Sequence, residues 1–362
     1  MKVLVTGGCG FIGSSIVRRL LREETVVFNL DKLTYAASLE ALSDVSNSPF
    51  YSLIEGDICD QAMLECLFEE FAPDAVIHCA AETHVDQSID GPSAFVNTNI
   101  VGTYQLLEAA RRWWSGKPGE HRFHHISTDE VYGSLSANDP AFTEASAYAP
   151  NSPYAASKAS ADHLVRAWGE TFGLPVVATN CSNNYGPWQF PEKLIPLMIL
   201  NGVERRPLPI YGQGDQVRDW LHVDDHAEAV WQVLQRGRTG ATYNVGGRCE
   251  KTNIEVVQLI CDELNGRWAE FDHHALIRNV ADRPGHDQRY AVDDRLVREE
   301  IGCAPKIAFE DGIRSTIDWY LAHQDWWQAI RMRRYDGERL GRAANQAGHR
   351  PKSEAQLLDR IA

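Results

Sequence analysis

The chain has 362 residues, of which 44% are hydrophobic and 23% are charged, and its formal net charge at pH 7 is -15. This composition is typical of a globular protein with one large or two medium domains. The acidic excess disfavours a nucleic-acid binder or a binder of anionic membranes, because both need surplus Lys and Arg, although a few local arginines can still hold an anionic substrate.

The eight cysteines form no Cys-x-x-Cys pair and no Cys/His cluster with zinc-ligand spacing. We therefore expect small, mostly buried free thiols in a reducing cytoplasm, and no bound metal. Residues 1–6 lead directly into a strand rather than into a signal peptide. No stretch approaches the ~20 apolar residues that a membrane-spanning helix needs. These features predict a cytoplasmic protein.

Short apolar runs alternate with amphipathic stretches through the first half of the chain. The apolar runs are residues 3–5, 25–30, 75–79, 123–127 and 176–179, and the helical stretches are 14–22, 62–71, 99–114 and 155–171. Fully apolar strands separated by helices indicate a parallel sheet covered on both faces. The sequence therefore predicts the α/β class, with a Rossmann-type doubly wound parallel sheet.

The second half of the chain is richer in proline and in irregular segments. We expect a Rossmann domain over residues 1–182, to which residues 215–245 return with a helix at 224–235. A smaller α+β substrate-binding domain is expected over 183–326. Residues 327–362 are basic and polar with weak apolar periodicity, which favours a loosely attached C-terminal extension, with a partner-binding segment as the alternative.

Three glycines, Gly7, Gly10 and Gly13, follow the first predicted strand and open the first helix. A Cβ at these positions would keep a pyrophosphate away from the N–H groups and the dipole of the helix N-terminus. Asp31 ends the second strand, where a carboxylate accepts hydrogen bonds from ribose hydroxyls and repels a 2′-phosphate. Strand, glycines, helix and acid together predict an NAD site rather than a tight turn with a surface aspartate.

Tyr154 and Lys158 are four residues apart and share a helical face. A free tyrosine has a pKa near ~10, and a neighbouring ammonium together with the positive charge of oxidised nicotinamide stabilises the phenolate. Tyr154 is therefore predicted to act as a base. Thr128 lies just past the fourth strand, where open α/β sheets bind ligands, and the carboxyl pair Asp129 and Glu130 follows it.

Eight motifs carry a resemblance to a known family. They are TGGCGFIG (6–13), DKLTYA (31–36), AAETHVD (80–86), STDEVYG (127–133), YAASK (154–158), NCSNNYGP (180–187), PEKLIP (191–196) and DRPGHD (282–287). On these motifs, residues 1–325 resemble the extended short-chain dehydrogenase/reductase family and, within it, the nucleotide-sugar 4,6-dehydratases. The stretch Ala36-Ala37-Ser38 departs from the family's usual Ala-Gly-Asn, and the chain beyond about 327 has no counterpart.

The resemblance implies an NAD-dependent dehydration of dTDP-glucose to its 4-keto-6-deoxy derivative in deoxysugar biosynthesis. It implies that Tyr154 takes the proton of O4 while C4 gives a hydride to NAD, and that Thr128 positions O4. Glu130 then removes the C5 proton, Asp129 protonates the departing C6 hydroxyl, the hydride returns to C6, and C5 is reprotonated. Adjacent carboxyls with opposite roles need environments that push their pKa values apart.

The expected ligand contacts follow from the same motifs and from the glycine loop. The predicted cofactor-binding residues are Gly7, Gly10, Phe11, Ile12, Gly13, Asp31, Lys32, Leu33, Thr34, Asp57, Ile58, Ala80, Ala81, Thr98, Tyr154, Lys158 and Asn184. The predicted substrate-binding residues are Thr83, Thr128, Asn183, Lys193, Leu194, Pro209, Ile210, Tyr211, Arg218, Asn253, Arg283 and His286. Arg218 and Arg283 are the best candidates for the diphosphate, because arginine grips phosphate oxygens in a bidentate way.

Other interpretations of single residues and of the whole chain stay open. Arg218 could instead form a surface ion pair with Asp215 or Asp219, and the strand histidines at 78, 124 and 125 are expected to pack rather than to catalyse. A 4-epimerase or UDP-glucuronate decarboxylase would share the glycine loop and Tyr-x-x-x-Lys but need no carboxyl pair. A non-catalytic NAD-binding protein would not need Tyr154. The resemblance also implies a homodimer, with helices 99–114 and 155–171 pairing between subunits.

Overall fold

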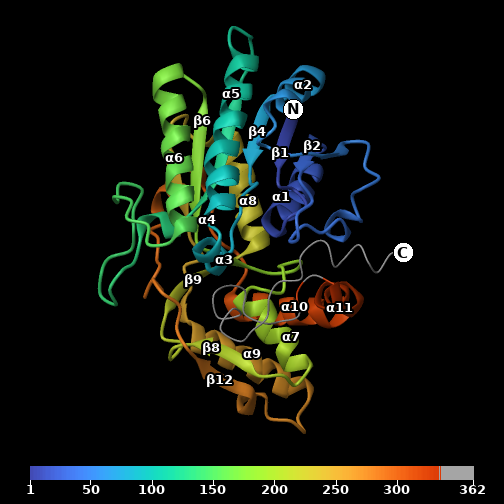
Figure 1. The fold of residues 1–362 in the computed structure, drawn as a ribbon, viewed down its shortest axis with the longest axis vertical. Coiled ribbons are helices and arrows are strands. Elements are labelled where there is room, and N and C mark those ends of the chain that lie inside the picture. Colours follow the sequence, from blue (N-terminus) through green and yellow to red (C-terminus); the bar gives the residue numbers. More distant parts are fainter. Residues whose placement is uncertain (334, 336–362) are drawn as a thin grey trace.

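A seven-stranded sheet lies at the centre of the upper part of the molecule (Figure 1). The structure, a computed structural model, describes residues 1–333 and 335. Its strands are β1 (Lys2–Thr6), β2 (Val26–Asp31), β3 (Tyr51–Glu55), β4 (Ala75–His78), β5 (Arg122–Thr128), β6 (Val176–Cys181), β7 (Asn183–Tyr185), β8 (Leu208–Tyr211), β9 (Val217–His222), β10 (Thr242–Val245), β11 (Glu250–Thr252) and β12 (Ile277–Val280).

Helices cover the sheet and build most of the lower part of the molecule. They are α1 (Phe11–Leu21), α2 (Gln61–Phe71), α3 (Val85–Asp90), α4 (Pro92–Phe95), α5 (Thr103–Trp114), α6 (Pro153–Phe172), α7 (Leu194–Val203), α8 (Val223–Arg236), α9 (Asn253–Arg267), α10 (Phe309–Ala322) and α11 (Gln324–Arg333). Shorter 3-10 or π-helical turns are η1 (Glu40–Leu42), η2 (Val96–Gly102), η3 (Asp129–Tyr132), η4 (His273–Leu276) and η5 (Val297–Ile301).

The strand order of the large sheet is β10-β6-β5-β4-β1-β2-β3, and all its pairs are parallel. Successive side chains of a strand point to opposite faces, so both faces of a central strand can be buried. In β1, Val3 and Val5 pack against α1 and α8, whereas Leu4 packs against α2 and α5. This arrangement confirms the predicted doubly wound α/β fold.

The order of the strands reverses direction at β1, because the chain first builds β2 and β3 on one side and then β4, β5 and β6 on the other. In an open parallel sheet a crevice forms at such a point, outside the carboxyl ends of the strands. The fold therefore places the glycine loop after β1 and the segment after β4 side by side.

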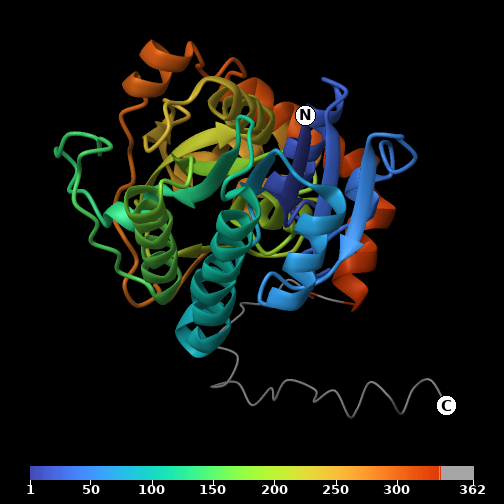
Figure 2. The ribbon, with the colours of Figure 1, turned by 90° about the horizontal axis from the view of Figure 1, so that it is seen from above.

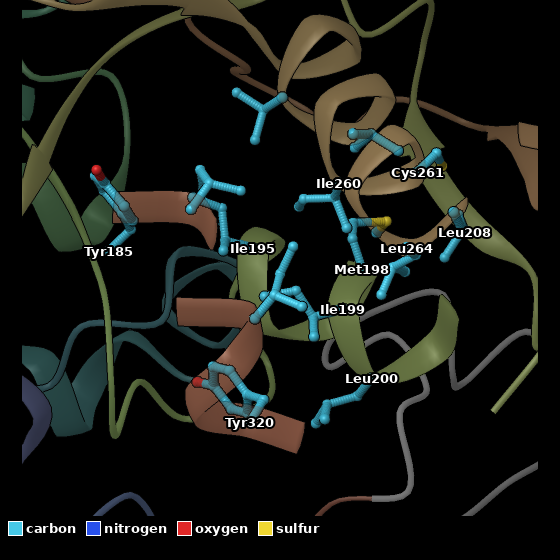
Figure 3. Close-up of a cluster of buried hydrophobic side chains, with 14 of the residues drawn as sticks. Tyr185, Ile195, Met198, Ile199, Leu200, Leu208, Ile260, Cys261, Leu264 and Tyr320 are labelled. Carbon is cyan, nitrogen blue, oxygen red and sulfur yellow. The ribbon is translucent and has the colours of Figure 1, made fainter. Parts of the chain in front are cut away.

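The lower part of the molecule has two small sheets, β11-β9-β7 and β12-β8, and a core of its own. Figure 3 shows this core, in which Ile195 and Met198 of α7 lie close to Ile260 and Leu264 of α9. Tyr320 of α10 joins the same cluster. A smaller α+β region thus forms next to the Rossmann part.

Two elements of the second half return to the Rossmann part, as the sequence suggests. Helix α8 matches the helix predicted at 224–235 and packs on α1, and β10 pairs with β6. The strand β9, which lies inside the predicted returning segment 215–245, pairs with β7 and β11 in a separate small sheet. The exact domain boundaries stay a prediction.

Three local features differ from the sequence-based expectations. The edge strand β3 was not predicted, because it lacks the fully apolar pattern of the buried strands and has several exposed residues. The helix predicted from residue 99 begins as the π-helical turn η2 and continues as α5. Half of the eight cysteines are buried, Cys66 is exposed, and all eight are free thiols.

The expectation of a loosely attached segment after residue 326 is wrong for the part that the structure describes. Trp327 and Ile330 of α11 are buried, and so is Tyr335. Their large apolar side chains bury enough surface to dock this end of the chain, despite its basic composition. Residues 336–362 lie outside the described part. Within the described part, no helix is both long and apolar enough to cross a membrane.

Candidate active site

A pocket of about 330 Å³ opens at the carboxyl ends of β1, β2, β4, β5 and β6. Its wall contains Gly7 after β1, Asp31 at the end of β2, Ala80 after β4 and Thr128 at the end of β5. This is the position that the reversal of strand order favours for a ligand. All five predicted catalytic residues, Thr128, Asp129, Glu130, Tyr154 and Lys158, line the pocket.

The glycine loop brings backbone to the pocket without side chains in the way. Gly7 has φ +73, and a Cβ there would lie 2.7 Å from the Cα of Ala80. A Cβ on Gly13 would lie 2.1 Å from the carbonyl oxygen of Gly7. No side chain caps α1, whose first residues Phe11 and Ile12 line the pocket. The open N-terminus of α1 therefore fits an anionic group such as a pyrophosphate.

The contact at Gly13 gives a stability prediction for the unliganded protein. Gly13→Ala is expected to lower the free energy of unfolding by ~1–3 kcal/mol, because the new methyl group must displace the backbone of the loop. Denaturant unfolding measures this change. Gly266→Ala, in α9, is the matched control: a Cβ there meets nothing within 4 Å, so no loss is expected. Equal unfolding energies for both variants would contradict the tight contact.

The carboxylate of Asp31 is fixed by two backbone groups. Its two oxygens accept hydrogen bonds from the N–H of Cys9 and of Leu33, both at 2.8 Å. Burial raises the pKa of Asp31, and these two N–H groups oppose the rise. Lys32 pairs with Asp57 at 2.7 Å. The carboxylate thus has a defined position at the pocket wall, where it can accept further hydroxyl groups.

The remaining predicted cofactor residues separate into two groups. Those that line the pocket are Gly7, Gly10, Phe11, Ile12, Gly13, Asp31, Lys32, Thr34, Asp57, Ile58, Ala80, Ala81, Thr98, Tyr154, Lys158 and Asn184. Leu33 does not line the pocket. Its side chain packs against the hydrophobic core, and its N–H donates a hydrogen bond to Asp31.

Tyr154 and Lys158 lie on the buried face of α6 and are 8% and 5% exposed. The ammonium of Lys158 donates to the carbonyl oxygen of Ile126 at 2.8 Å. Burial raises the pKa of Tyr154 well above its ordinary value, Glu130 adds to the rise, and Thr128 opposes it. We expect the phenolate to be stabilised by Lys158 together with oxidised nicotinamide, and the raised pKa belongs to the protein without that cofactor. A further positive charge at the pocket is needed.

The two carboxyls after Thr128 have different surroundings. Asp129 is 1% exposed, and burial together with the neighbouring Glu130 raises its pKa well above the ordinary value. Burial also raises the pKa of Glu130, but Arg283, Arg218 and Lys193 oppose that rise. Asp129 therefore holds its proton more strongly, and Glu130 ionises more readily. These are the states that an acid and a neighbouring base require.

The predicted substrate residues lie at two levels. Thr83, Thr128, Asn183 and Lys193 line the pocket. Leu194, Pro209, Ile210, Tyr211, Arg218, Asn253, Arg283 and His286 do not.

Some of this second group meet at Asp86. Tyr211 donates to Asp86 at 3.0 Å, and Arg283 lies 3.9 Å from it. His286 contacts Asp282 at 2.6 Å, and its ring lies edge-on to that of Tyr211. A second polar surface, with one cation and several hydrogen-bonding groups, is thus assembled from β8 and the segment after β12.

Arg218 and Ile210 are less available for substrate binding than the sequence suggests. Arg218 is buried, donates to the carbonyl oxygens of Val217 and Asp287, and lies over the ring of Tyr290. Among the described residues it makes neither of the surface ion pairs considered above. Its charge still lowers the pKa of Asp129 and Glu130. The side chain of Ile210 belongs to the lower hydrophobic core.

Several pocket residues were not predicted from the sequence. They are Leu30, Ala36, Ala37, Gly56, Cys79, Glu82, Ile126, Ser127, Cys181, Ser182, Gln189, Phe190 and Glu192. Most are direct neighbours of predicted residues, so extending each motif by one or two positions would have found them. Gln189 and Phe190 come from an irregular loop that has no periodic signal.

The strand histidines pack in the sheet, as predicted. The ring of His78 lies between the hydroxyls of Thr6 and Thr103, and His124 contacts Thr179. His125 contacts Asp162 at 3.0 Å. Burial lowers the pKa of all three histidines.

Asp162 lies one helical turn beyond Lys158 and also accepts a hydrogen bond from Ser127 at 2.8 Å. Burial raises its pKa to about 6, and Lys158 opposes the rise. Asp162 in turn favours the charged form of Lys158. A buried carboxylate thus supports the ammonium on the face of α6 that lines the pocket.

Comparisons with known proteins agree with this geometry. Residues 4–316 match the family described as GDP-mannose 4,6 dehydratase. The chain is 56% identical to dTDP-glucose 4,6-dehydratase of Salmonella typhimurium over 350 residues, which cover 92% of this chain and 97% of that protein. It is 55% identical to the enzyme of the same name from Neisseria meningitidis, with 94% and 99% covered.

Among solved structures, the dTDP-glucose 4,6-dehydratase DesIV from Streptomyces venezuelae, with NAD and TYD bound, superimposes with a TM-score of 0.85. It is 44% identical, and the match covers 91% of this chain and 100% of that one. The chain therefore belongs to the GDP-mannose 4,6 dehydratase family, and its resemblance to the nucleotide-sugar 4,6-dehydratases is confirmed.

Proposed function

We propose that this protein catalyses the NAD-dependent dehydration of dTDP-glucose to dTDP-4-keto-6-deoxyglucose in deoxysugar biosynthesis. The observation that carries the proposal is the buried Asp129–Glu130 pair, which shares one pocket with Tyr154 and Lys158. The high identity to dTDP-glucose 4,6-dehydratases over almost the whole chain supports the same activity.

The cofactor is NAD, and the residues present fit it. Gly7, Gly10 and Gly13 leave room for the pyrophosphate at the N-terminus of α1, and Asp31 suits an unphosphorylated ribose. Lys158, which lines the pocket, would hold the nicotinamide ribose. When bound, NAD accepts a hydride from C4 of the sugar and returns it to C6.

The side chains on β5, η3 and α6 carry the proton transfers. Tyr154 removes the proton of O4, while Thr128 orients that oxygen with its hydroxyl. Burial raises the pKa of Tyr154 in the protein without cofactor. The positive charge of oxidised nicotinamide would lower this pKa once the cofactor is bound. The base therefore becomes effective in the complete complex.

Water loss follows from the 4-keto group, which acidifies the proton at C5. Glu130 takes that proton, and Asp129 gives its own proton to the departing C6 hydroxyl. The stronger hold of Asp129 on its proton matches this division of roles. The atoms balance, because one water leaves, the hydride that left C4 returns to C6, and C5 regains a proton, while the proton that Tyr154 took from O4 replaces the one that Asp129 gave.

The substrate is proposed to lie between the catalytic residues and the polar surface around Asp86. Thr83 and Asn183 at the pocket wall would contact the sugar, and Lys193 the diphosphate. Arg283 is the better candidate of the two predicted arginines for the phosphates, because Arg218 is committed to backbone carbonyls. Tyr211 and His286 would border the nucleoside.

Incubation with dTDP-glucose and with UDP-glucose tests the proposal. A 4-keto sugar absorbs in the near ultraviolet after addition of alkali, so the signal is expected to develop much faster with dTDP-glucose. Absence of the signal with both sugars would refute the dehydratase activity. Formation of the C4 epimer without loss of water would identify a 4-epimerase instead.

We also propose a cytoplasmic homodimer in which α5 and α6 of two copies pack together. The two helices lie side by side at the surface in both views (Figures 1 and 2). Val101, Tyr104 and Phe172 on or beside them are large exposed hydrophobics, which mark an interaction surface. Sedimentation should give a dimer for the native chain and a monomer for Tyr104→Asp. A monomeric native chain would exclude this assembly.

A further inference from the structure

The last described residues connect two loops that carry pocket residues. Trp326 and Ile330 of α11 pack with Tyr335 in a small hydrophobic cluster that also includes Phe190 and Tyr35. We name Trp326, Ile330 and Tyr335 the C-terminal clasp. Its partners come from the Rossmann part on one side and from the loop before α7 on the other.

The first loop is residues 34–38, on the cofactor side of the pocket. The indole N–H of Trp326 donates to the hydroxyl of Ser38 at 3.0 Å. The N–H of Ser38 donates to the carbonyl oxygen of Cys9, inside the glycine loop, at 2.8 Å. Thr34, Ala36 and Ala37 of the same loop line the pocket. The clasp is thus linked through Ser38 to the glycine loop of the proposed dinucleotide site.

The second loop is residues 189–193, which come before α7 and also carry pocket residues. The ring of Tyr335 lies 6.2 Å from that of Phe190, which in turn meets Tyr35 edge-on at 5.4 Å. The hydroxyl of Tyr35 donates to Glu192 at 3.2 Å. Phe190 and Glu192 both line the pocket. Tyr35 and Phe190 therefore join the two loops directly, and Tyr335 of the clasp packs on Phe190 beside this contact.

The clasp itself is anchored on the substrate side. The guanidinium of Arg331 contacts Glu204 at 2.6 Å and Asn201 at 2.7 Å, both beside or within α7. The indole N–H of Trp327 donates to the carbonyl oxygen of Tyr320 at 2.9 Å. Because α11 is fixed at this end, its contacts with residues 34–38 restrain movement of the cofactor-side loop away from α7.

We infer that the C-terminal clasp holds residues 34–38 and 189–193 together at the edge of the pocket and thereby retains NAD between turnovers. This inference rests on the proposed function. It fits the proposed chemistry, in which the hydride taken from C4 returns to C6 of the same sugar, so that no exchange of cofactor is needed. Trp326 and Tyr335 would then be positioning residues that never touch the substrate.

The test compares NAD retention in purified holoenzymes. Tyr335→Ala removes the ring that meets Phe190, and Trp326→Phe keeps an aromatic ring but removes the bond to Ser38. Met332→Ala is the matched control, because Met332 lies on the same helix and is 79% exposed. The readouts are the NAD content of each protein after acid release and the rate of NAD dissociation in the presence of a trap.

Tyr335→Ala should release NAD about tenfold faster, and Trp326→Phe severalfold faster. Each variant loses one aromatic or hydrogen-bonding contact between the clasp and a loop that lines the pocket. Met332→Ala should match the native protein. Native rates in both clasp variants would overturn the inference. Since Trp326→Phe preserves most of the packing, it remains informative if Tyr335→Ala folds poorly. A native protein that binds no NAD would instead refute the proposed function.

Discussion

Replacing Glu130 by Gln is expected to separate oxidation from water loss. The amide keeps the shape of the side chain but cannot accept the C5 proton, so kcat for the dehydrated product should fall by about 10²–10⁴-fold, the range for loss of a general base. Tyr154, Thr128 and Lys158 are unchanged, so oxidation at C4 remains possible. Mass spectrometry of a single turnover should then detect a keto sugar that has lost two hydrogens but no water.

Glu144→Gln is a suitable control for this experiment. Burial raises the pKa of Glu144 as it does that of Glu130. Glu144 lies outside the pocket, however, and accepts a hydrogen bond from the N–H of Asn244. Its replacement should leave the product unchanged. Full dehydratase activity of the Glu130→Gln protein would show that another group removes the C5 proton.

Tyr154→Phe is expected to stop the reaction before any change in the sugar. Without the phenol, no group at the end of α6 can take the proton of O4, and turnover should fall by about 10²–10⁴-fold. Exchange of the C5 proton with D₂O should also disappear, because the 4-keto group that acidifies it never forms. NMR of the recovered sugar measures this exchange.

Two proteins serve as references for the Tyr154 variant. Tyr104→Phe removes a hydroxyl outside the pocket but keeps the ring at the proposed dimer surface, and it should behave as the native chain does. Glu130→Gln should lack C5 exchange as well, yet still oxidise C4. A Tyr154→Phe protein that retains C4 oxidation would contradict the role of Tyr154 as base.

The sheet and the face of α6 that lines the pocket could be predicted because their signals are local. Apolar runs such as residues 75–79 lie in fully buried strands, and the spacing of Tyr154 and Lys158 fixes their common face. The glycine spacing likewise needs no tertiary information. These features depend on the period of the secondary structure, which appears in the spacing of residues along the sequence.

The features that could not be predicted depend on distant partners. Nothing near Arg218 in sequence announces that the carbonyl oxygen of Asp287 accepts its hydrogen bonds. The basic composition after residue 326 concealed the docking of α11, because Trp327 and Ile330 find their partners only in the folded chain. The raised pKa of Tyr154 similarly results from burial, which a motif does not reveal.

We propose that Asp129 and Glu130 make this pocket the site of a dehydration in which one hydride passes from C4 to C6 of the sugar. Turnover of dTDP-glucose labelled with deuterium at C4, followed by mass spectrometry and NMR of the product, tests it most directly. The expected product is a 4-keto-6-deoxy sugar that carries the label at C6 and has lost one water. An epimerised sugar that retains both its C6 hydroxyl and its label at C4 would contradict it.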